Sequence, residues 1–271
     1  MMNYLNYSLL VYFQSILSLI GSMITNKRTI IIYLWLCLVP VCFSFWDVLH
    51  ANASTEMIRR KQVEPTGKVI WEVPTQKKVI ALTFDDGPNP VYTPQILALL
   101  RQYEATATFF SIGYQMERYP QIVRRVVQEG HELGNHSMTH SYEDRVGFER
   151  MRSELIRADK VIQKYQQNKP KLFRPPGGYI DNLLLQESIQ NGYKVVLWST
   201  NQDTKDWSLP GAQVIADHVI RHARSGDIVL LHDGGGDRKQ TIEALKTILP
   251  VLKQQGYQFV SVSELLNYRN N

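Results

Sequence analysis

From residue 78 onward, short apolar runs alternate with longer stretches that have apolar residues at helical spacing. Short runs rich in β-branched and aromatic residues are typical of buried strands. We expect strands at residues 78–84, 107–112, 132–136, 171–174, 193–198, 227–231 and 257–262. We expect helices at residues 93–103, 119–130, 148–166, 182–190, 212–223 and 241–255.

This alternation of strands and helices predicts βαβ units and a mainly parallel sheet, in one catalytic domain over residues 78–271. Such units can close into a barrel or remain an open sheet, and the periodicity does not distinguish the two. Both arrangements place active sites at the carboxyl ends of the strands. The chemistry should therefore be sought just after each predicted strand.

The N-terminal 53 residues differ from the rest of the chain. Residues 1–26 have no charged side chain, Lys27 and Arg28 follow, and an apolar run then extends over residues 29–46. Positive charge before an apolar run is typical of a secretory signal, and the run is also long enough for an uncleaved membrane anchor. We therefore expect residues 1–53 to direct the domain out of the cytoplasm, either as a cleaved signal or as a tether.

The exact start of this leader has alternatives. Ala51 and Ala53 fit a small-residue cleavage site, so cleavage would leave a mature chain beginning near Ser54. Translation from Met23 would give an ordinary signal peptide, whereas a start at Met1 leaves residues 4–24 as a further apolar segment. Residues 54–77 are polar and contain prolines, which indicates a spacer before the domain.

Composition narrows the classes of function. The net charge is +5 and no block of lysine and arginine occurs, so nucleic acid is not indicated as a partner. Cys37 and Cys42 both lie in the apolar run of the leader. The exported part has no cysteine, which excludes a disulfide or a thiolate metal site there.

Acidic, imidazole and guanidinium side chains recur at the ends of the predicted strands, and this recurrence is the main indication of chemistry. Two histidines four residues apart, with a carboxylate, form a plausible divalent-metal site with an open position. Each motif alone has a simpler interpretation, such as a solvated loop, a turn, a helix cap or a surface residue. Their occurrence together, in this order, favours a catalytic metal site. The residues are Asp85, Asp86, His136, His140, Arg174, Asp203, Asp206, His232 and Asp233.

With these residues in place, the chain resembles the polysaccharide deacetylases of carbohydrate esterase family 4, the NodB-homology domain. The motifs "TFDDGP", "HSMTH", "RPPGG", "DTKDW" and "LLHD" match that family's five motifs in type and order. The resemblance covers roughly residues 79–268, and the motifs are highly specific as a set. It implies an α/β fold, a distorted (β/α) barrel with about seven strands, which removes acetyl groups from polysaccharides with the help of one divalent metal.

The resemblance also implies a role for individual residues. The metal ligands would be Asp86, His136 and His140, and the metal would be zinc, with cobalt, manganese or nickel as alternatives. Asp85 would act as the general base and His232 as the general acid. Their respective partners would be Arg174 and Asp206.

Substrate contacts are implied for a further set of residues: Gly177, through its backbone N–H, Tyr179, Trp207 and Leu230. Many relatives carry Arg-x-Pro-Tyr, whereas this chain continues after Pro176 with two glycines before Tyr179. The departure leaves the backbone donor in place but displaces the aromatic wall. Simple core packing is an equal alternative for Leu230.

The function that we expect is metal-dependent N-deacetylation of N-acetylglucosamine in peptidoglycan or chitin-like oligomers by a monomer. One alternative keeps the reaction but acts on acetylxylan or N-acetylmuramic acid. A second alternative is an inactive carbohydrate-binding relative, which the intact set of motif residues disfavours.

Overall fold

The computed structural model describes residues 60–141, 148–166 and 172–269. Its strands form one sheet in which every ladder is parallel, in the order β1-β6-β5-β4-β3-β2-β7, with β8 paired to β2. The strands are β1 (Val69–Ile70), β2 (Val79–Asp85), β3 (Ala107–Ser111), β4 (Glu132–Asn135), β5 (Leu172–Phe173), β6 (Lys194–Val196), β7 (Ile228–His232) and β8 (Gln258–Phe259). Every strand predicted from the sequence is present, and β1 was not predicted.

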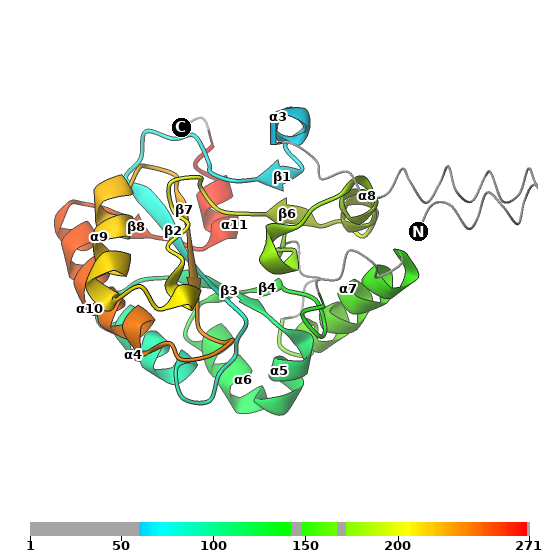
Figure 1. Ribbon diagram of the computed structural model, residues 1–271, viewed down its shortest axis with the longest axis horizontal. Helices are drawn as coiled ribbons and strands as arrows, with labels where there is room; N and C mark the ends of the chain where they lie inside the picture. The colour runs from blue at the N-terminus through cyan, green and yellow to red at the C-terminus, as the bar shows by residue number, and fades with distance from the viewer. Residues whose placement is uncertain (1–59, 142–147, 167–171, 270–271) are drawn as a thin grey trace, which may run out of the picture. The chain divides into compact units, whose positions relative to one another are not determined.

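Most of the helices lie around the outside of this sheet, whereas α11 (Val262–Leu266) packs against the interior cluster (Figure 1). The helices are α3 (Arg60–Val63), α4 (Thr93–Gln102), α5 (Gly113–Arg118), α6 (Pro120–Gln128), α7 (Phe148–Ile162), α8 (Asn182–Gln190), α9 (Ala212–His222), α10 (Lys239–Gln254) and α11 (Val262–Leu266). The described residues also form three short 3-10 helices: η1 (Glu64–Thr66), η2 (Pro176–Gly178) and η3 (Asp206–Ser208). The predicted helices are confirmed, while α3, α5 and α11 are additional.

The sheet curves into a barrel that is closed by irregular chain. Beyond β6, residues 199–204 run beside β7: the Ser199 N–H donates to the Ile228 carbonyl at 3.0 Å, and the Leu230 N–H donates to the Gln202 carbonyl at 3.1 Å. These bonds occupy the edge of β7 that a regular strand would cover. The fold is thus a distorted (β/α) barrel, as the family resemblance implied.

Alternation along β2 separates two apolar layers. Ile80, Leu82 and Phe84 pack with the helices in the largest core cluster, whereas Val79 and Ala81 face the barrel interior. Successive strand residues point to opposite faces, so one buried strand can serve both layers. Because β2 pairs with both β3 and β7, it forms the rigid centre on which the polar residues at its end are held.

The segment at residues 54–77 is not a spacer in the part that the structure describes. Ile70 is 2% exposed, Val73 is fully buried, and the Val73 N–H donates to the Gly226 carbonyl at 2.9 Å. The prediction failed because β1 is only two residues long, which is too short for a periodicity to appear. The domain therefore begins before residue 78.

The predicted leader at residues 1–53 lies outside the described residues. Among the residues that are described, no helix is both long and apolar enough to span a membrane.

Candidate metal centre and catalytic site

The chemistry-bearing residues lie at one edge of the barrel because every strand ladder is parallel. Asp85 is the last residue of β2 and is paired in register with His232, the last residue of β7. His136 directly follows β4, and Arg174 directly follows β5. Asp206 begins η3, in the connection that follows β6. The structure thus brings the predicted catalytic and ligand residues to the carboxyl ends of the strands.

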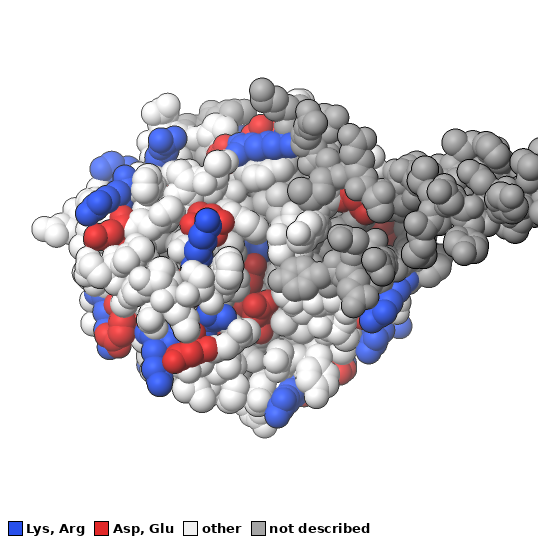
Figure 2. All heavy atoms as spheres, in the orientation of Figure 1, with Lys and Arg blue, Asp and Glu red and all other residues white. Residues whose placement is uncertain are grey.

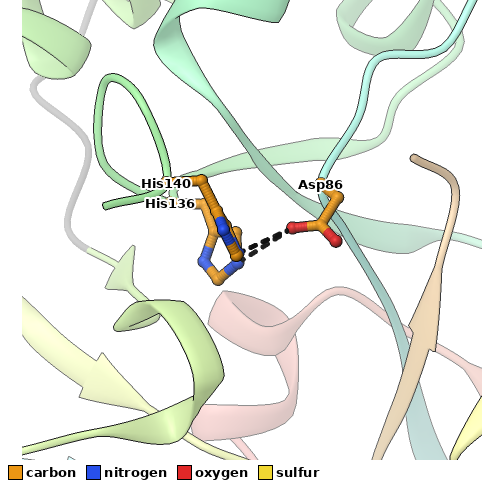
Figure 3. Close-up of side chains that lie close together, drawn as sticks. All are labelled: Asp86, His136 and His140. Atoms are coloured by element: carbon orange, nitrogen blue, oxygen red, sulfur yellow. Dashed lines mark ion pairs between the residues drawn. The ribbon is translucent and has the colours of Figure 1, made fainter. Parts of the chain in front are cut away.

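Asp86, His136 and His140 form a cluster in which three potential ligand atoms lie within 4.8 Å of one another. Asp86 Oδ1 is 3.0 Å from His140 Nε2 and 3.4 Å from His136 Nε2. Figure 3 shows both imidazole rings turned toward the same carboxylate oxygen. This buried oxygen accepts no hydrogen bond from the described residues. A buried carboxylate oxygen that lacks a hydrogen bond and faces two imidazole nitrogens fits a divalent cation.

Hydrogen bonds and the local backbone conformation orient the two histidines. His136 Nδ1 donates to the Arg174 carbonyl oxygen at 2.7 Å, which leaves Nε2 with its lone pair toward Asp86. His140 has a left-handed backbone, with φ 59°, and its N–H donates to Ser137 Oγ at 2.9 Å. A left-handed residue reverses the chain within the loop after β4. Both rings therefore reach one point although they are four residues apart.

The electrostatics of the cluster suit a cation. Burial acts to raise the pKa of Asp86, but the imidazoles of His136 and His140 outweigh it and hold that pKa well below its usual range. Burial acts to lower the pKa of His136, yet the charges of Asp85 and Asp86 raise it above the ordinary value. The cluster thus favours positive charge between the carboxylates and the imidazoles. A metal ion and a proton compete for the same imidazole lone pair.

Asp85 has a different partner from its neighbour. Arg174 is fully buried, and its Nη1 donates to Asp85 Oδ1 at 2.8 Å and to Thr83 Oγ1 at 2.7 Å. The rest of the guanidinium donates to the main-chain carbonyls of Val196 and Leu197 at the end of β6. The guanidinium carbon lies 4.1 Å from the Phe110 ring centroid. The guanidinium thus compensates the charge of Asp85 and fixes its carboxylate.

His232 is held by Asp206 in the same manner. Asp206 is fully buried; its Oδ1 lies 2.6 Å from His232 Nδ1, and its Oδ2 accepts from the His232 N–H at 2.9 Å and from Thr241 Oγ1 at 2.7 Å. Burial acts to lower the pKa of His232, but Asp206 outweighs it and raises that pKa above the ordinary value. The imidazole can therefore hold a proton near neutral pH.

The predicted substrate contacts have different exposures. Tyr179 is 51% and Trp207 57% exposed, so neither is a core residue. Gly177 is exposed with φ 62°, and the described residues offer its N–H no hydrogen-bond acceptor. Leu230 is buried, on the same face of β7 as His232, two residues before it. Contact of any of these with a substrate stays a prediction.

The sequence did not predict the residues that hold the metal-ligand loop in place by hydrogen bonds. Asn135 Oδ1 accepts from the Ser137 N–H at 2.9 Å, and Glu154 Oε2 accepts from the Thr139 N–H at 2.7 Å. These two side chains pin the loop that carries both histidines. The sequence signal for Glu154 was weak, a carboxylate in a highly charged helix. Its burial at 4% exposure appears only in the fold.

Asp233 is also buried next to the site. Burial raises the pKa of its carboxyl to about 7, although a hydrogen bond from Thr93 Oγ1 opposes the shift. Its Oδ1 has no hydrogen-bond partner among the described residues. The Asp233 N–H donates to the Asp85 carbonyl at 3.1 Å, so Asp233 joins the end of β7 to the end of β2.

Comparison with known proteins agrees with this geometry. The family model described as polysaccharide deacetylase matches residues 72–196. A peptidoglycan-N-acetylglucosamine deacetylase of Bacillus cereus is 54% identical over 214 residues, which cover 79% of this chain and 100% of the relative.

Two solved structures show the same fold. One is a peptidoglycan N-acetylglucosamine deacetylase in complex with an N-oxidanyl-benzamide, with 32% identity, a TM-score of 0.73 and coverage of 76% of this chain and 96% of that one. Another is a family 4 acetyl xylan esterase of Clostridium thermocellum with a cobalt ion, with 37% identity, a TM-score of 0.63 and coverage of 70% and 91%. With its five motifs gathered at one edge of the barrel, the chain belongs to the polysaccharide deacetylases of carbohydrate esterase family 4.

Proposed function

We propose that this protein is a metal-dependent N-deacetylase that hydrolyses the acetamido group of N-acetylglucosamine units in peptidoglycan or in chitin-like oligomers. The observation that carries the proposal is the convergence of a carboxylate–imidazole metal cluster with an Asp85–Arg174 pair and a His232–Asp206 pair. The relative with 54% identity over its full length, named as a peptidoglycan-N-acetylglucosamine deacetylase, supports the substrate.

Asp86, His136 and His140 would hold the cation, and the remaining coordination positions would be open to water and substrate. Zinc fits this set of two imidazoles and one carboxylate, and cobalt, manganese and nickel accept the same ligands. When bound, such an ion lowers the pKa of a coordinated water and polarises a carbonyl oxygen.

Asp85 would serve as the general base. It lies beside the ligands, with its Oδ2 at 3.8 Å from His136 Nε2, while its Oδ1 is held by Arg174. It takes a proton from the attacking water as the water oxygen bonds to the acetyl carbon. Arg174 holds the carboxylate in place and is a positioning residue in this scheme.

His232 would serve as the general acid. Asp206 keeps its Nδ1 hydrogen-bonded, so Nε2 is the nitrogen that can give a proton to the leaving sugar amine. The C–N bond then breaks, and the products are acetate and a free amine. The base Asp85 thus lies beside a cation, and the acid His232 lies beside an anion. This difference in neighbouring charge lets Asp85 be ionised and His232 be protonated at the same pH.

Gly177 is an exposed residue, and its N–H would donate to the developing oxyanion. Trp207 and Tyr179 offer aromatic surface to the sugar, and Leu230 offers an apolar wall to the acetyl methyl group.

Outside the cytoplasm is where a polymer substrate of this kind occurs. We propose that residues 1–53 carry the domain there, by a cleaved signal or as a membrane tether, and that it acts as a monomer. Acetylxylan and N-acetylmuramic acid are the alternative substrates. An inactive carbohydrate-binding relative is the alternative from another class.

A panel of substrates tests the proposal. The zinc-loaded protein would be incubated with peptidoglycan, N-acetylglucosamine oligomers and acetylxylan, and released acetate would be measured. We expect acetate from the first two at a rate well above that from acetylxylan. Release from acetylxylan alone would support the alternative substrate, and carbohydrate binding without any acetate would support the inactive relative.

A further inference from the structure

The segment between β7 and α10 forms a wall behind Asp86 and has no part in the mechanism above. A Cβ atom on Gly234 would collide with the main-chain oxygen of Asp86, and one on Gly235 would lie 2.5 Å from Asp86 Oδ2. Gly235 also has φ 72°, in the left-handed region that glycine adopts without strain. The bare main chain of this segment therefore touches both the backbone and the carboxylate of the metal-ligand residue.

Arg238 fastens this segment from inside the protein. It is only 3% exposed, and its Nε donates to the Gly234 carbonyl at 2.6 Å while Nη2 donates to the Gly235 carbonyl at 3.0 Å. Nη1 donates to the Asp237 carbonyl at 3.2 Å. Within the described parts of the chain, no carboxylate forms an ion pair with this guanidinium. These three hydrogen bonds all go to the main chain of its own loop.

A buried cation without a carboxylate partner is costly, since its lost hydration is only partly replaced by carbonyl oxygens. Lysine could not replace it, because a planar guanidinium reaches several carbonyls in fixed directions. Asp86 itself has φ 71°, an unfavourable backbone for a residue with a side chain. Such a backbone persists only when its surroundings over-determine it.

We propose that Arg238 is a positioning residue for the metal ligand Asp86. It acts through Gly234 and Gly235, which it holds against Asp86 so that the carboxylate stays aimed at His136 and His140. The consequence is tighter binding of the divalent cation. This inference rests on the metal site of the proposed function.

The test measures the dissociation constant of zinc by competition with a chromophoric chelator, on full-length protein. Groups that orient metal ligands typically change affinity by about 10–100-fold when removed. We expect Arg238→Met to weaken zinc binding within that range. Arg238→Lys should be nearly as weak, because it restores the charge but not the planar geometry. Lys239→Met, in which an adjacent cation with a 76% exposed side chain is lost, should bind zinc as the wild type does.

A second variant acts on Asp86 without removing the arginine. Gly235→Ala places a methyl group against Asp86 Oδ2, so zinc affinity should also fall. The absorption spectrum of the cobalt-loaded protein gives a readout that a purely structural role would not change. In both Arg238→Met and Gly235→Ala we expect altered band positions, which report a displaced ligand. If Arg238→Met does not fold, Gly235→Ala decides the matter by the same two readouts.

His140→Ala separates this inference from the proposed function. If the wild type binds zinc, His140→Ala loses it, and Arg238→Met and Gly235→Ala bind it like the wild type with unchanged cobalt spectra, only the inference is overturned. Full affinity in Arg238→Lys would also overturn it, since charge alone would then suffice. If the wild type binds no zinc, the metal site itself is wrong.

Discussion

Asp85 and Asp86 are neighbours in sequence with different surroundings, because the backbone turns between them. Asp85 is still in β2, paired with Phe110 on one side and His232 on the other, whereas Asp86 has φ 71°. In a continuing strand the two side chains would point to opposite faces. The turn lets both serve one site, one beside a guanidinium and the other beside two imidazoles.

Asp86→Asn and Asp85→Asn should therefore fail in different ways. Asp86→Asn should lose metal, because a neutral amide is a poorer ligand than a carboxylate. Asp85→Asn should keep metal but lose its proton acceptor, which lowers kcat by about 10²–10⁴-fold. Metal content and kcat measured on both variants decide between them. If the metal is lost from Asp85→Asn and kept in Asp86→Asn, the two roles must be exchanged.

Asp206 should control the alkaline side of the pH profile. The general acid works while His232 is protonated, so activity falls as the pH rises through the His232 pKa. Burial lowers that pKa and Asp206 raises it beyond the burial effect. Asp206→Asn removes the negative charge that raises the His232 pKa, so this pKa should fall. The alkaline decrease in kcat/KM should therefore move to lower pH.

The matched control is Asp203→Asn, a carboxylate in the same loop whose Oδ1 caps the Lys205 N–H and does not contact His232. This variant should leave the alkaline limb in place. An unshifted limb in Asp206→Asn would contradict the role of the pair.

At the scale of secondary-structure elements, β1 is the piece that ties the start of the domain to its barrel. Val69 and Ile70 pair with Val195 and Val196 of β6, and Ile70 packs in the interior cluster. The edge of β6 that this short strand covers would otherwise leave backbone groups unpaired.

Ile70→Ala should consequently lower the free energy of unfolding by about 2–5 kcal/mol, the usual cost of such a truncation in a packed core. Denaturant unfolding of the wild type and variant measures the difference. Val214→Ala, at a position 55% exposed on α9, should change it by less than about 0.5 kcal/mol. An equally small effect of Ile70→Ala would mean that the segment is a spacer after all.

The long apolar strands were predictable because each carries its own pattern, as β2 does with a buried residue at every position. The closing chain beyond β6 was not, because Ser199, Gln202 and Thr204 are polar and reach β7 by main-chain and hydroxyl bonds. Such hydrogen bonds cannot be predicted from a pattern of apolar residues.

In the site, too, some residues could be predicted from the sequence and others could not. Residues that do chemistry stand at strand ends and match family motifs, so their positions could be predicted. Residues that support them, such as Glu154 and Arg238, act across the fold on main-chain atoms. Their partners become visible only when distant parts of the chain meet. For this reason Arg238 remained an ordinary charged residue in the sequence.

At the scale of the whole molecule, both signs of charge occur on the face that Figure 2 shows. Figure 2 shows lysine and arginine interspersed with acidic residues over the visible face. On this face, neither sign of charge gathers into a single patch. A small positive net charge favours approach to an anionic polymer.

The leader should determine where the domain acts. If the chain is cleaved after the small residues that precede Ser54, the mature protein begins near Ser54. If the leader is not cleaved, its apolar run keeps the protein on the membrane. N-terminal sequencing and fractionation of the protein from its native host separate these outcomes. Protein found in the cytosol with Met1 intact would contradict both.

Metal content and acetate release, measured on the same sample with peptidoglycan as substrate, test the central claim most directly. We expect protein stripped by a chelator to release no acetate, and one equivalent of zinc to restore release in the wild type but not in His140→Ala. Undiminished acetate release from metal-free protein, or none from protein that holds a full equivalent of zinc, would contradict the account.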